Sequence, residues 1–122
     1  MLKGVNSVLY YASDLGKTAQ FYEELGFEVE KSGDTVKARL GDFALAFVDK
    51  NKSVIQKEAQ FEPKGMGVFV YVEVDDVDDY FKSLKENGIK TSSEPRDWPW
   101  GKREFAVKDP DGYKLIFYQP IK

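Results

Sequence analysis

The sequence predicts an α+β fold in which one strand, helix, strand, strand pattern occurs twice in tandem. Three observations support this prediction. The chain has 122 residues, which is enough for a single domain with a real core. Residues 8–27 and 70–89 show the same order of apolar positions, helix start and helix stop at a constant offset of 62 residues. Each half then closes with strand-like segments around a turn signal.

The first half is predicted to begin with a strand and a helix. Residues 5–12 are rich in β-branched and aromatic side chains, as strands are. Ser13 and Asp14 offer a helix cap before apolar residues at helical spacing, and Gly26 ends the helix. A hairpin follows, with strands at 35–40 and 43–48, and a short extra strand is expected near Phe27.

The second half repeats this order. Residues 68–74 read as a strand, Asp75 and Asp76 cap a helix, and Asn87–Gly88 ends it. A second hairpin is predicted from strands at 103–107 and 113–118 around an Asp-Pro-Asp-Gly turn. We therefore expect one domain over residues 1–122, with a first module at about 1–49, a polar connector at 50–67 and a second module at about 68–122.

Composition excludes several classes of function. The chain has 18 basic and 21 acidic residues, a formal net charge of −3, and this argues against a nucleic-acid partner. It has no cysteine and no histidine, which excludes disulfides, thiolate nucleophiles, serine–histidine catalysis and the commonest transition-metal ligands. No apolar run is long enough to span a membrane, and the first residues do not resemble a signal peptide. We expect a cytoplasmic protein with no membrane partner.

Three motifs together resemble the glyoxalase, bleomycin-resistance and extradiol-dioxygenase superfamily, also called vicinal oxygen chelate proteins. They are SDLGKTAQFYEELGF, VEVDDVDDYFKSLKENGI and REFAVKDPDGYKLIFYQP, and they cover nearly the whole chain in order. The resemblance implies two βαβββ modules that form a curled mixed sheet, with helices outside and a ligand cleft inside. It also implies a homodimer. The sequence leaves open whether the modules pair within one chain or swap between subunits.

The resemblance further implies where a metal would bind. Enzymes of that superfamily usually hold a divalent cation through strands of both modules, and the four positions fall on Ser7, Ala46, Phe69 and Ile116. A serine hydroxyl beside three apolar side chains does not offer the donors that a divalent cation needs. We therefore expect no metal and no cofactor, and an apolar pocket suited to an organic ligand.

The closing segment, residues 100–112, is similar to the bleomycin-resistance proteins, which lack these ligands and sequester a cationic antibiotic. The leading hypothesis is therefore metal-free binding of a small, aromatic or cationic, antibiotic-like molecule. An alternative is a glyoxalase- or dioxygenase-like enzyme, a lyase or isomerase, that uses a carboxylate or a tyrosine of the same cleft as acid or base without the usual metal, for instance Glu73 with its pKa raised by burial. A third hypothesis is a non-catalytic dimeric interaction module.

If the metal positions implied by the resemblance face the cleft, alternation along the strands brings further residues to the same side, and the tryptophan segment 98–100 adds two more. The candidate ligand-binding residues are Ser7, Tyr11, Phe69, Tyr71, Glu73, Trp98, Trp100, Ile116 and Tyr118. The competing interpretation is that these side chains fill a packed core, but the polar tips of the tyrosines, Ser7 and Glu73 favour a wet pocket.

Three further features remain open or have a structural interpretation. The segment Trp98-Pro99-Trp100 either covers the cleft as a loop or packs against a second subunit. The acidic residues 75–79 are expected to cap a helix and not to bind a cation. Arg103 and Glu104 alternate on one strand, so one of them faces the cleft, and the sequence does not decide which.

Overall fold

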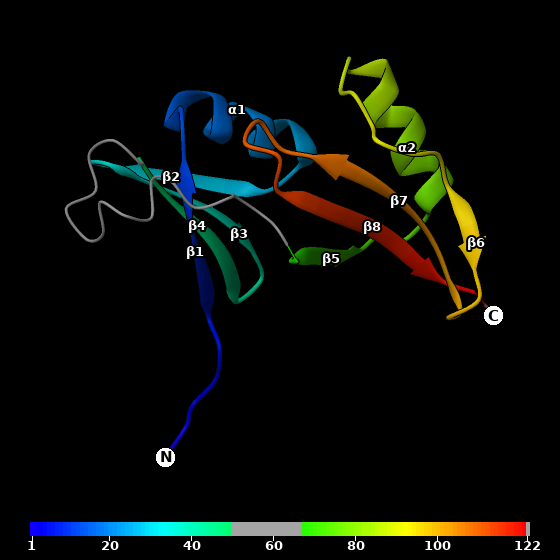
Figure 1. Cartoon of the computed structure of the whole chain (residues 1–122), viewed down its shortest axis with the longest axis horizontal. Coiled ribbons are helices and arrows are strands. Elements are labelled where there is room, and N and C mark those ends of the chain that lie inside the picture. Colours follow the sequence, from blue (N-terminus) through cyan, green and yellow to red (C-terminus); the bar gives the residue numbers. More distant parts are fainter. Residues whose placement is uncertain (50–66, 122) are drawn as a thin grey trace. The chain divides into compact units, whose positions relative to one another are not determined.

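The same order of elements, one strand, one helix and three strands, occurs in both units of the chain (Figure 1). The computed structural model describes residues 1–49 and 67–121. The units are Met1–Lys64 and Gly65–Lys122. The predicted connector at 50–67 lies outside the described residues except for Gly67. The α+β fold of two tandem βαβββ units is thus confirmed.

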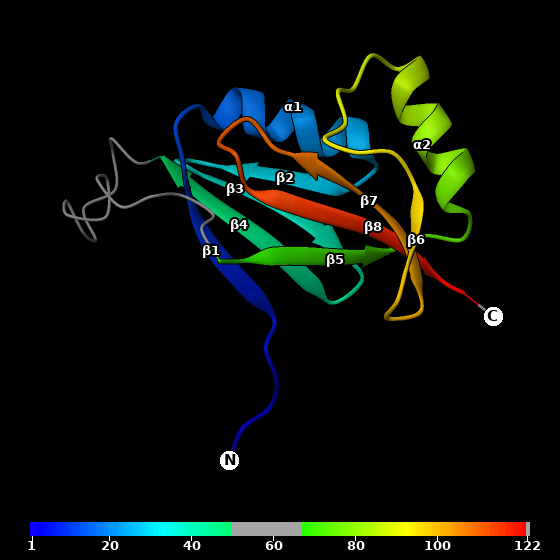
Figure 2. The same ribbon diagram turned by 45° about the vertical axis from the view of Figure 1, so that its right-hand side comes forward.

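The first unit is a four-stranded mixed sheet with one helix. The strand order is β1-β4-β3-β2, with β1 parallel to β4 and the other neighbours antiparallel (Figure 2). The predicted extra strand is β2, and the predicted hairpin is β3 and β4. The bounds are β1 (Ser7–Ala12), α1 (Leu15–Leu25), β2 (Glu28–Ser32), β3 (Thr35–Leu40) and β4 (Phe43–Asp49).

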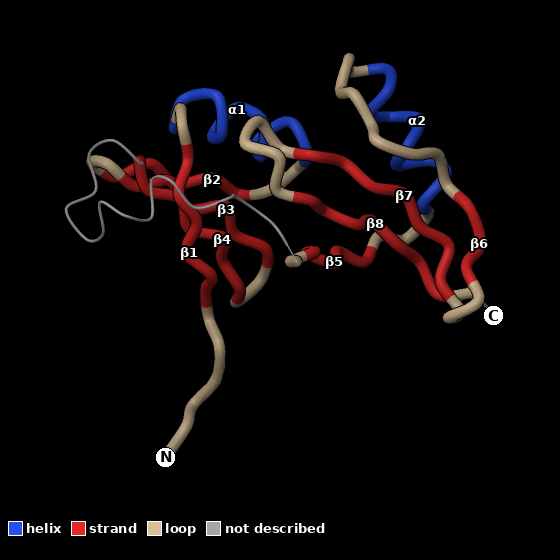
Figure 3. The backbone as a smooth tube through the Cα atoms, in the orientation of Figure 1, coloured by secondary structure: helices blue, strands red, loops and turns tan. Residues whose placement is uncertain are grey.

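The second unit repeats this topology with the strand order β5-β8-β7-β6, and β5 is parallel to β8. The hairpin predicted around the Asp-Pro-Asp-Gly turn is β7 and β8. The strand β6 was not predicted, because its residues were interpreted as part of a loop. Figure 3 shows the strands and helices along both units. The bounds are β5 (Phe69–Glu73), α2 (Val77–Glu86), β6 (Arg96–Trp98), β7 (Lys102–Lys108) and β8 (Lys114–Pro120).

Each helix covers one face of the sheet in its own unit. In the first unit, Tyr22 of α1 is 1% exposed and its ring lies 5.0 Å from that of Phe47. In the second unit, Tyr80 of α2 lies 4.9 Å from Phe117, and Phe81 lies 5.2 Å from Phe105. Burial of these rings stabilises each unit by the usual hydrophobic effect, because apolar area leaves water.

The predicted caps hold both helices at their first turns. Asp14 Oδ1 accepts a hydrogen bond from the Lys17 amide at 3.1 Å, and Asp76 Oδ1 accepts one from the Asp79 amide at 3.0 Å. Gly26 ends α1 in the left-handed conformation, with a φ of 106° that other residues rarely adopt. The capping interpretation of the acidic residues 75–79 is therefore confirmed at Asp76.

The face of the second sheet that α2 does not cover carries alternate residues of β5–β8, among them Tyr71, Glu104, Ile116 and Tyr118. We call it the open face. Glu104 lies opposite Tyr118 in the strand register, and Tyr71 lies opposite Ile116. Arg103 points to the other side, where it binds Asp78 of α2. Of Arg103 and Glu104, Glu104 therefore lies on the open face and Arg103 lies on the α2 side.

Candidate functional site

The two tryptophans form a stacked pair at the end of β6. Trp98 ends β6, and Trp100 lies in the turn to β7. Their ring centroids are 4.7 Å apart and their planes differ by 12°. The guanidinium of Arg96 lies 3.8 Å from the Trp98 centroid, so a cation, a half-buried indole and an exposed indole lie in series. Trp100 is 55% exposed and therefore presents aromatic surface to solvent.

Glu104 fixes the orientation of Trp100. Its Oε1 accepts a hydrogen bond from the Trp100 indole Nε1 at 2.8 Å. Glu104 is only 7% exposed, although it lies on the open face, because the surrounding aromatic side chains cover it. Among the described residues, Glu104 forms no ion pair with a lysine or an arginine. The site therefore contains a buried carboxylate held by a neutral donor, with no cation on the carboxylate itself.

Two tyrosines lie beside Glu104 on neighbouring strands. The Tyr71 and Tyr118 rings meet edge to face with centroids 5.7 Å apart. The Tyr118 hydroxyl donates to Glu73 Oε1 at 3.3 Å. Partial burial, and then the charge of Glu104 and a hydrogen bond to it, raise the pKa of Tyr71 above its ordinary value.

The pKa of Tyr118 rises in the same way, through partial desolvation and then through Glu73. Both phenols therefore hold their protons to a higher pH than a free tyrosine does. Each phenol donates a hydrogen bond to a carboxylate, Tyr71 to Glu104 and Tyr118 to Glu73.

Lys102 lies over both tyrosine rings. Its Nζ is 4.6 Å from the Tyr71 centroid and 4.6 Å from the Tyr118 centroid. A second lysine, Lys114, lies 5.2 Å from the Phe69 centroid on the same face. Phe69 is 53% exposed and Ile116 is 8% exposed. The open face therefore combines large aromatic surfaces, two carboxylates and amino groups, which suits an organic ligand better than a packed core.

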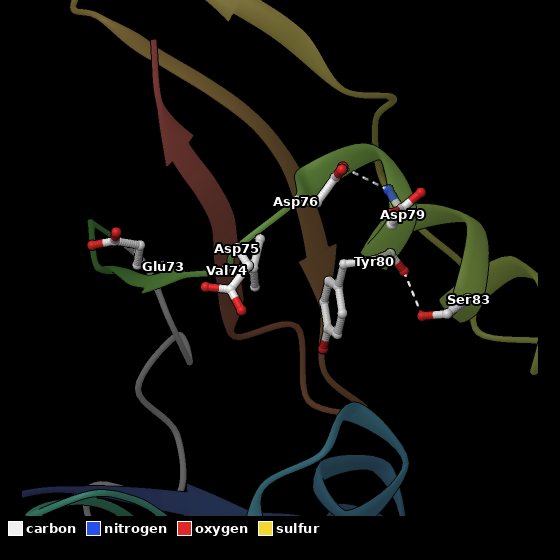
Figure 4. A pocket seen from close by; sticks show the side chains of 7 residues that line it. All are labelled: Glu73, Val74, Asp75, Asp76, Asp79, Tyr80 and Ser83. Carbon is white, nitrogen blue, oxygen red and sulfur yellow. Dashed lines mark hydrogen bonds between the residues drawn. The ribbon is translucent and has the colours of Figure 1, made fainter. Parts of the chain in front are cut away.

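A hollow of about 580 Å³ lies next to this face, where β5 leads into α2 (Figure 4). Glu73 lines it together with Asp75, Asp76 and Asp79. Asp76 is already engaged as the helix cap, as the dashed line in Figure 4 shows. Because the hollow is open and its carboxylates lie at a helix start, we interpret it as a solvated capping region.

Of the predicted ligand-binding residues, seven lie in the second unit, and the structure brings most of these together on the open face. Ser7 and Tyr11 lie in the first unit, on the face of that sheet which α1 does not cover. Their part in a cleft shared by both units stays a prediction. The alternative hypothesis, in the form that uses Glu73, requires this residue to be buried. Glu73 is exposed, so this requirement is not met.

Sequence reasoning missed Arg96 and Lys102 as site residues and left Glu104 as one of two alternatives with Arg103. The alternation of β7 contained a usable signal, because Phe105 and Val107 are apolar and had to face the helix. Glu104 and Lys102 then had to lie on the opposite side.

Comparison with known proteins places this geometry in a family. Residues 4–117 match the model of the family described as the glyoxalase/bleomycin resistance protein/dioxygenase superfamily. The chain belongs to this superfamily. The metallothiol transferase FosB of Staphylococcus epidermidis is 28% identical over 118 residues, which cover 94% of this chain and 82% of FosB.

Solved structures show the same fold. A glyoxalase/bleomycin resistance protein/dioxygenase from Nocardioides has a TM-score of 0.83 at 22% identity, covering all of this chain and 86% of that one. A lactoylglutathione lyase from Agrobacterium tumefaciens has a TM-score of 0.74 at 20% identity, covering 97% and 94%. At these identities the likeness establishes the fold and not the activity.

The residues at the four superfamily metal positions do not fit a divalent cation. Ser7 is a lone hydroxyl that donates to Asn6 Oδ1 at 3.3 Å. Ala46, Phe69 and Ile116 carry no donor atoms on their side chains. Within residues 1–49 and 67–121, no group of three or more acidic, histidine or cysteine side chains is placed to hold a metal ion. In the same residues, no helix is long and apolar enough to cross a membrane.

Proposed function

We propose that this superfamily member binds a small planar molecule, aromatic or cationic in character, on the open face and releases it unchanged, without a metal or a cofactor. The observation that carries the proposal is the Trp98–Trp100 stack. A hydrogen bond to buried Glu104 fixes Trp100, and yet the ring is 55% exposed. A large indole held rigidly in water is suited to stack on a planar ligand at little entropic cost.

Charge supports the same proposal. Glu73 and Glu104 accept hydrogen bonds from neutral donors and form no ion pair with described residues. A ligand cation near them would gain Coulomb attraction that no side chain of the described part supplies to them directly. Sequestration of an antibiotic-like molecule, a homodimer in solution and a cytoplasmic location belong to this proposal as further expectations.

The test uses the protein's own fluorescence. The chain has two tryptophans and both are in the stack, so intrinsic tryptophan emission reports on this site alone. We would titrate with N-methylacridinium, acridine and acridine-9-carboxylate at pH 8, which share a ring system and differ in charge. We expect saturable quenching, strongest for the cation and weakest for the anion. Bleomycin would be titrated in parallel, and mass spectrometry should recover every ligand unchanged.

Variants locate the binding site. Trp100→Ala should weaken N-methylacridinium binding at least tenfold by calorimetry, a loss typical of one stacking contact. The double change of Trp98 and Trp100 to alanine should abolish binding while the circular dichroism spectrum is retained. Phe43→Ala is the matched control, because Phe43 is 37% exposed but lies on the α1 side of the first sheet. An equal loss of affinity in Trp100→Ala and Phe43→Ala, or no loss in either, would show that the tryptophan stack is not part of the binding site.

A further inference from the structure

Lys102 occupies a position that a ligand cation would suit. Its Nζ lies at the same distance, 4.6 Å, from the ring centroids of Tyr71 and Tyr118. Ammonium groups within about 6 Å of aromatic faces are attracted by the ring quadrupole. The edge-to-face geometry of the two rings lets one ammonium interact with both. The two tyrosines therefore form a cation seat, and the chain's own lysine occupies it.

No carboxylate of the described residues forms an ion pair with Lys102. Ion pairs in the same part of the chain join Lys31, Arg39 and Arg103 to carboxylates. Lys102 is half-buried and is the residue opposite Trp98 in the register of β6 and β7. A flexible lysine stem can swing its ammonium into water without loss of a salt bridge. The seat is thus closed by a group that is easily displaced.

The two carboxylates lie behind this seat. Tyr118 donates to Glu73, and the charge and hydrogen-bonding of Glu104 act on Tyr71. Each ring of the seat therefore has a carboxylate hydrogen-bonded to its hydroxyl group, which adds an acceptor for a cationic ligand next to the ring. Glu104 also accepts from Trp100, so one residue connects the seat to the tryptophan stack.

We propose that Tyr71 and Tyr118 form a subsite for a compact ammonium group of the ligand, and that Lys102 is a built-in competitor which must leave before the ligand binds. The inference rests on the proposed function, since it names the ligand's charged group on the same face. It predicts an amine or quaternary ammonium attached to the planar ring system. It also predicts that the wild-type affinity equals the affinity of the free seat multiplied by the fraction of molecules in which Lys102 has left the seat.

The test removes the competitor. Lys102→Met keeps a side chain of similar length without the charge. Tetramethylammonium is the probe, because it has no ring to stack on Trp100. Its methyl proton resonance should move upfield over the tyrosine rings in a titration followed by NMR. We expect Lys102→Met to bind tetramethylammonium about tenfold more tightly than wild type, as loss of a competing cation–π contact implies.

Two controls separate displacement from simple charge removal. Lys114→Met changes the net charge equally, but the Lys114 ammonium lies over the Phe69 ring and not over the two tyrosines, so we expect less than a twofold change. Adding Tyr71→Leu to Lys102→Met should abolish the upfield shift. Equal tightening in both lysine variants, or no tightening in Lys102→Met, would overturn the inference. Weaker binding in Lys102→Met would overturn it too.

The acridine titration keeps the two proposals distinguishable. One outcome is that N-methylacridinium quenches the wild-type protein while Lys102→Met binds tetramethylammonium no more tightly than wild type. That result would overturn the ammonium subsite and leave the stacking function intact. Tightening for tetramethylammonium without any acridine quenching would support the seat and remove the planar ligand. If neither signal is observed, both proposals are overturned.

Discussion

Three tyrosines of the second unit show how single residues set the chemistry of this surface. Partial burial and then the neighbouring carboxylates raise the pKa values of Tyr71 and Tyr118 above the ordinary value. Tyr80 lies on the other side of the sheet, against Phe105 and Phe117, and burial raises its pKa to about 12. The first two phenols lie on a polar surface, and the third is half-buried against the rings of Phe105 and Phe117.

The raised pKa of Tyr80 predicts a loss of stability in alkali. The folded state holds this proton more tightly than the unfolded chain, whose tyrosine titrates near 10.0. Stability is therefore unaffected below pH 10 and falls as pH rises towards 12, by about 2–3 kcal/mol for a shift of this size. Tyr80→Phe keeps the ring packing and should abolish this part of the decline. Urea unfolding followed by circular dichroism at pH 9 and pH 11.5 would measure it.

Other lysines and tyrosines titrate in the same range, so the comparison between wild type and Tyr80→Phe is the informative quantity. Tyr118→Phe serves as a control for the loss of a less buried phenol. An identical alkaline decline in wild type and Tyr80→Phe would show that Tyr80 ionises freely in the folded protein.

At residue level the sequence predicted the aromatic members of the candidate site and Glu73, but not Arg96 or Lys102, and it left Glu104 open. Tyr71, Trp100 and Tyr118 stood out by type and by alternation. The choice between Arg103 and Glu104 depended on the register of β7 against β8 and on which face α2 covers. The position of Lys102 over the two rings is a property of side-chain packing, which no local pattern encodes.

Among the elements, the two helices were the easiest to predict. Each start has a capping aspartate followed by apolar residues at helical spacing, and both signals lie within a few residues. The strand β6 was missed for the opposite reason. Its three residues, Arg96–Trp98, have no alternation and follow Pro95, so pairing with β7 is what makes them a strand.

Arg103 connects three elements of the second unit. Its guanidinium donates to both carboxylate oxygens of Asp78 in α2 at 2.9 Å, and to Asp97 in β6 at 3.1 Å. The hydrogen bonds from Arg103 hold the pKa of Asp78 below its ordinary value. Both carboxylates are exposed, so solvent weakens the attraction.

We expect Arg103→Gln to lower the free energy of unfolding by about 0.5–1 kcal/mol at low salt, and by less in 1 M NaCl. The lowered pKa of Asp78 means that this stabilisation is present above about pH 4 and is lost as pH falls through the folded-state value. Urea unfolding at pH 7 and pH 2.5 would check both statements.

Two variants test the origin of the effect. Arg103→Lys should recover only part of the loss, because lysine cannot donate to both oxygens of one carboxylate in a fixed fork. Lys108→Gln removes an exposed cation of the same strand and should change stability by less than 0.5 kcal/mol, as surface changes usually do. A loss as large as that of Arg103→Gln would assign the effect to net charge.

For the whole molecule, the tandem repeat determined the fold class, and the fold alone does not determine the function. Relatives and structural neighbours include proteins named as a metallothiol transferase and a lactoylglutathione lyase. One fold thus supports several chemistries, and the residues of the site decide among them. Here the open face carries an aromatic stack and two carboxylates, which offer contact area and hydrogen-bond acceptors to a ligand.

The last prediction concerns divalent metals. A cation that binds the folded state raises the melting temperature by an amount that grows with its concentration relative to its dissociation constant, whereas one without a site leaves it unchanged. Because Ser7, Ala46, Phe69 and Ile116 offer one hydroxyl between them, we expect less than about 1 °C of change on adding Zn²⁺, Mn²⁺ or Mg²⁺, or on adding EDTA. Adding these metals or EDTA should also leave the quenching by N-methylacridinium unchanged.

The acidic hollow at the start of α2 supplies the necessary control. Asp79→Asn removes one of its carboxylates, so a weak metal effect that disappears in this variant belongs to the hollow. A rise in melting temperature that grows with cation concentration and survives Asp79→Asn would show a metal site elsewhere and would contradict metal-free binding. Since the test reads stability and not turnover, its outcome does not depend on knowing the ligand.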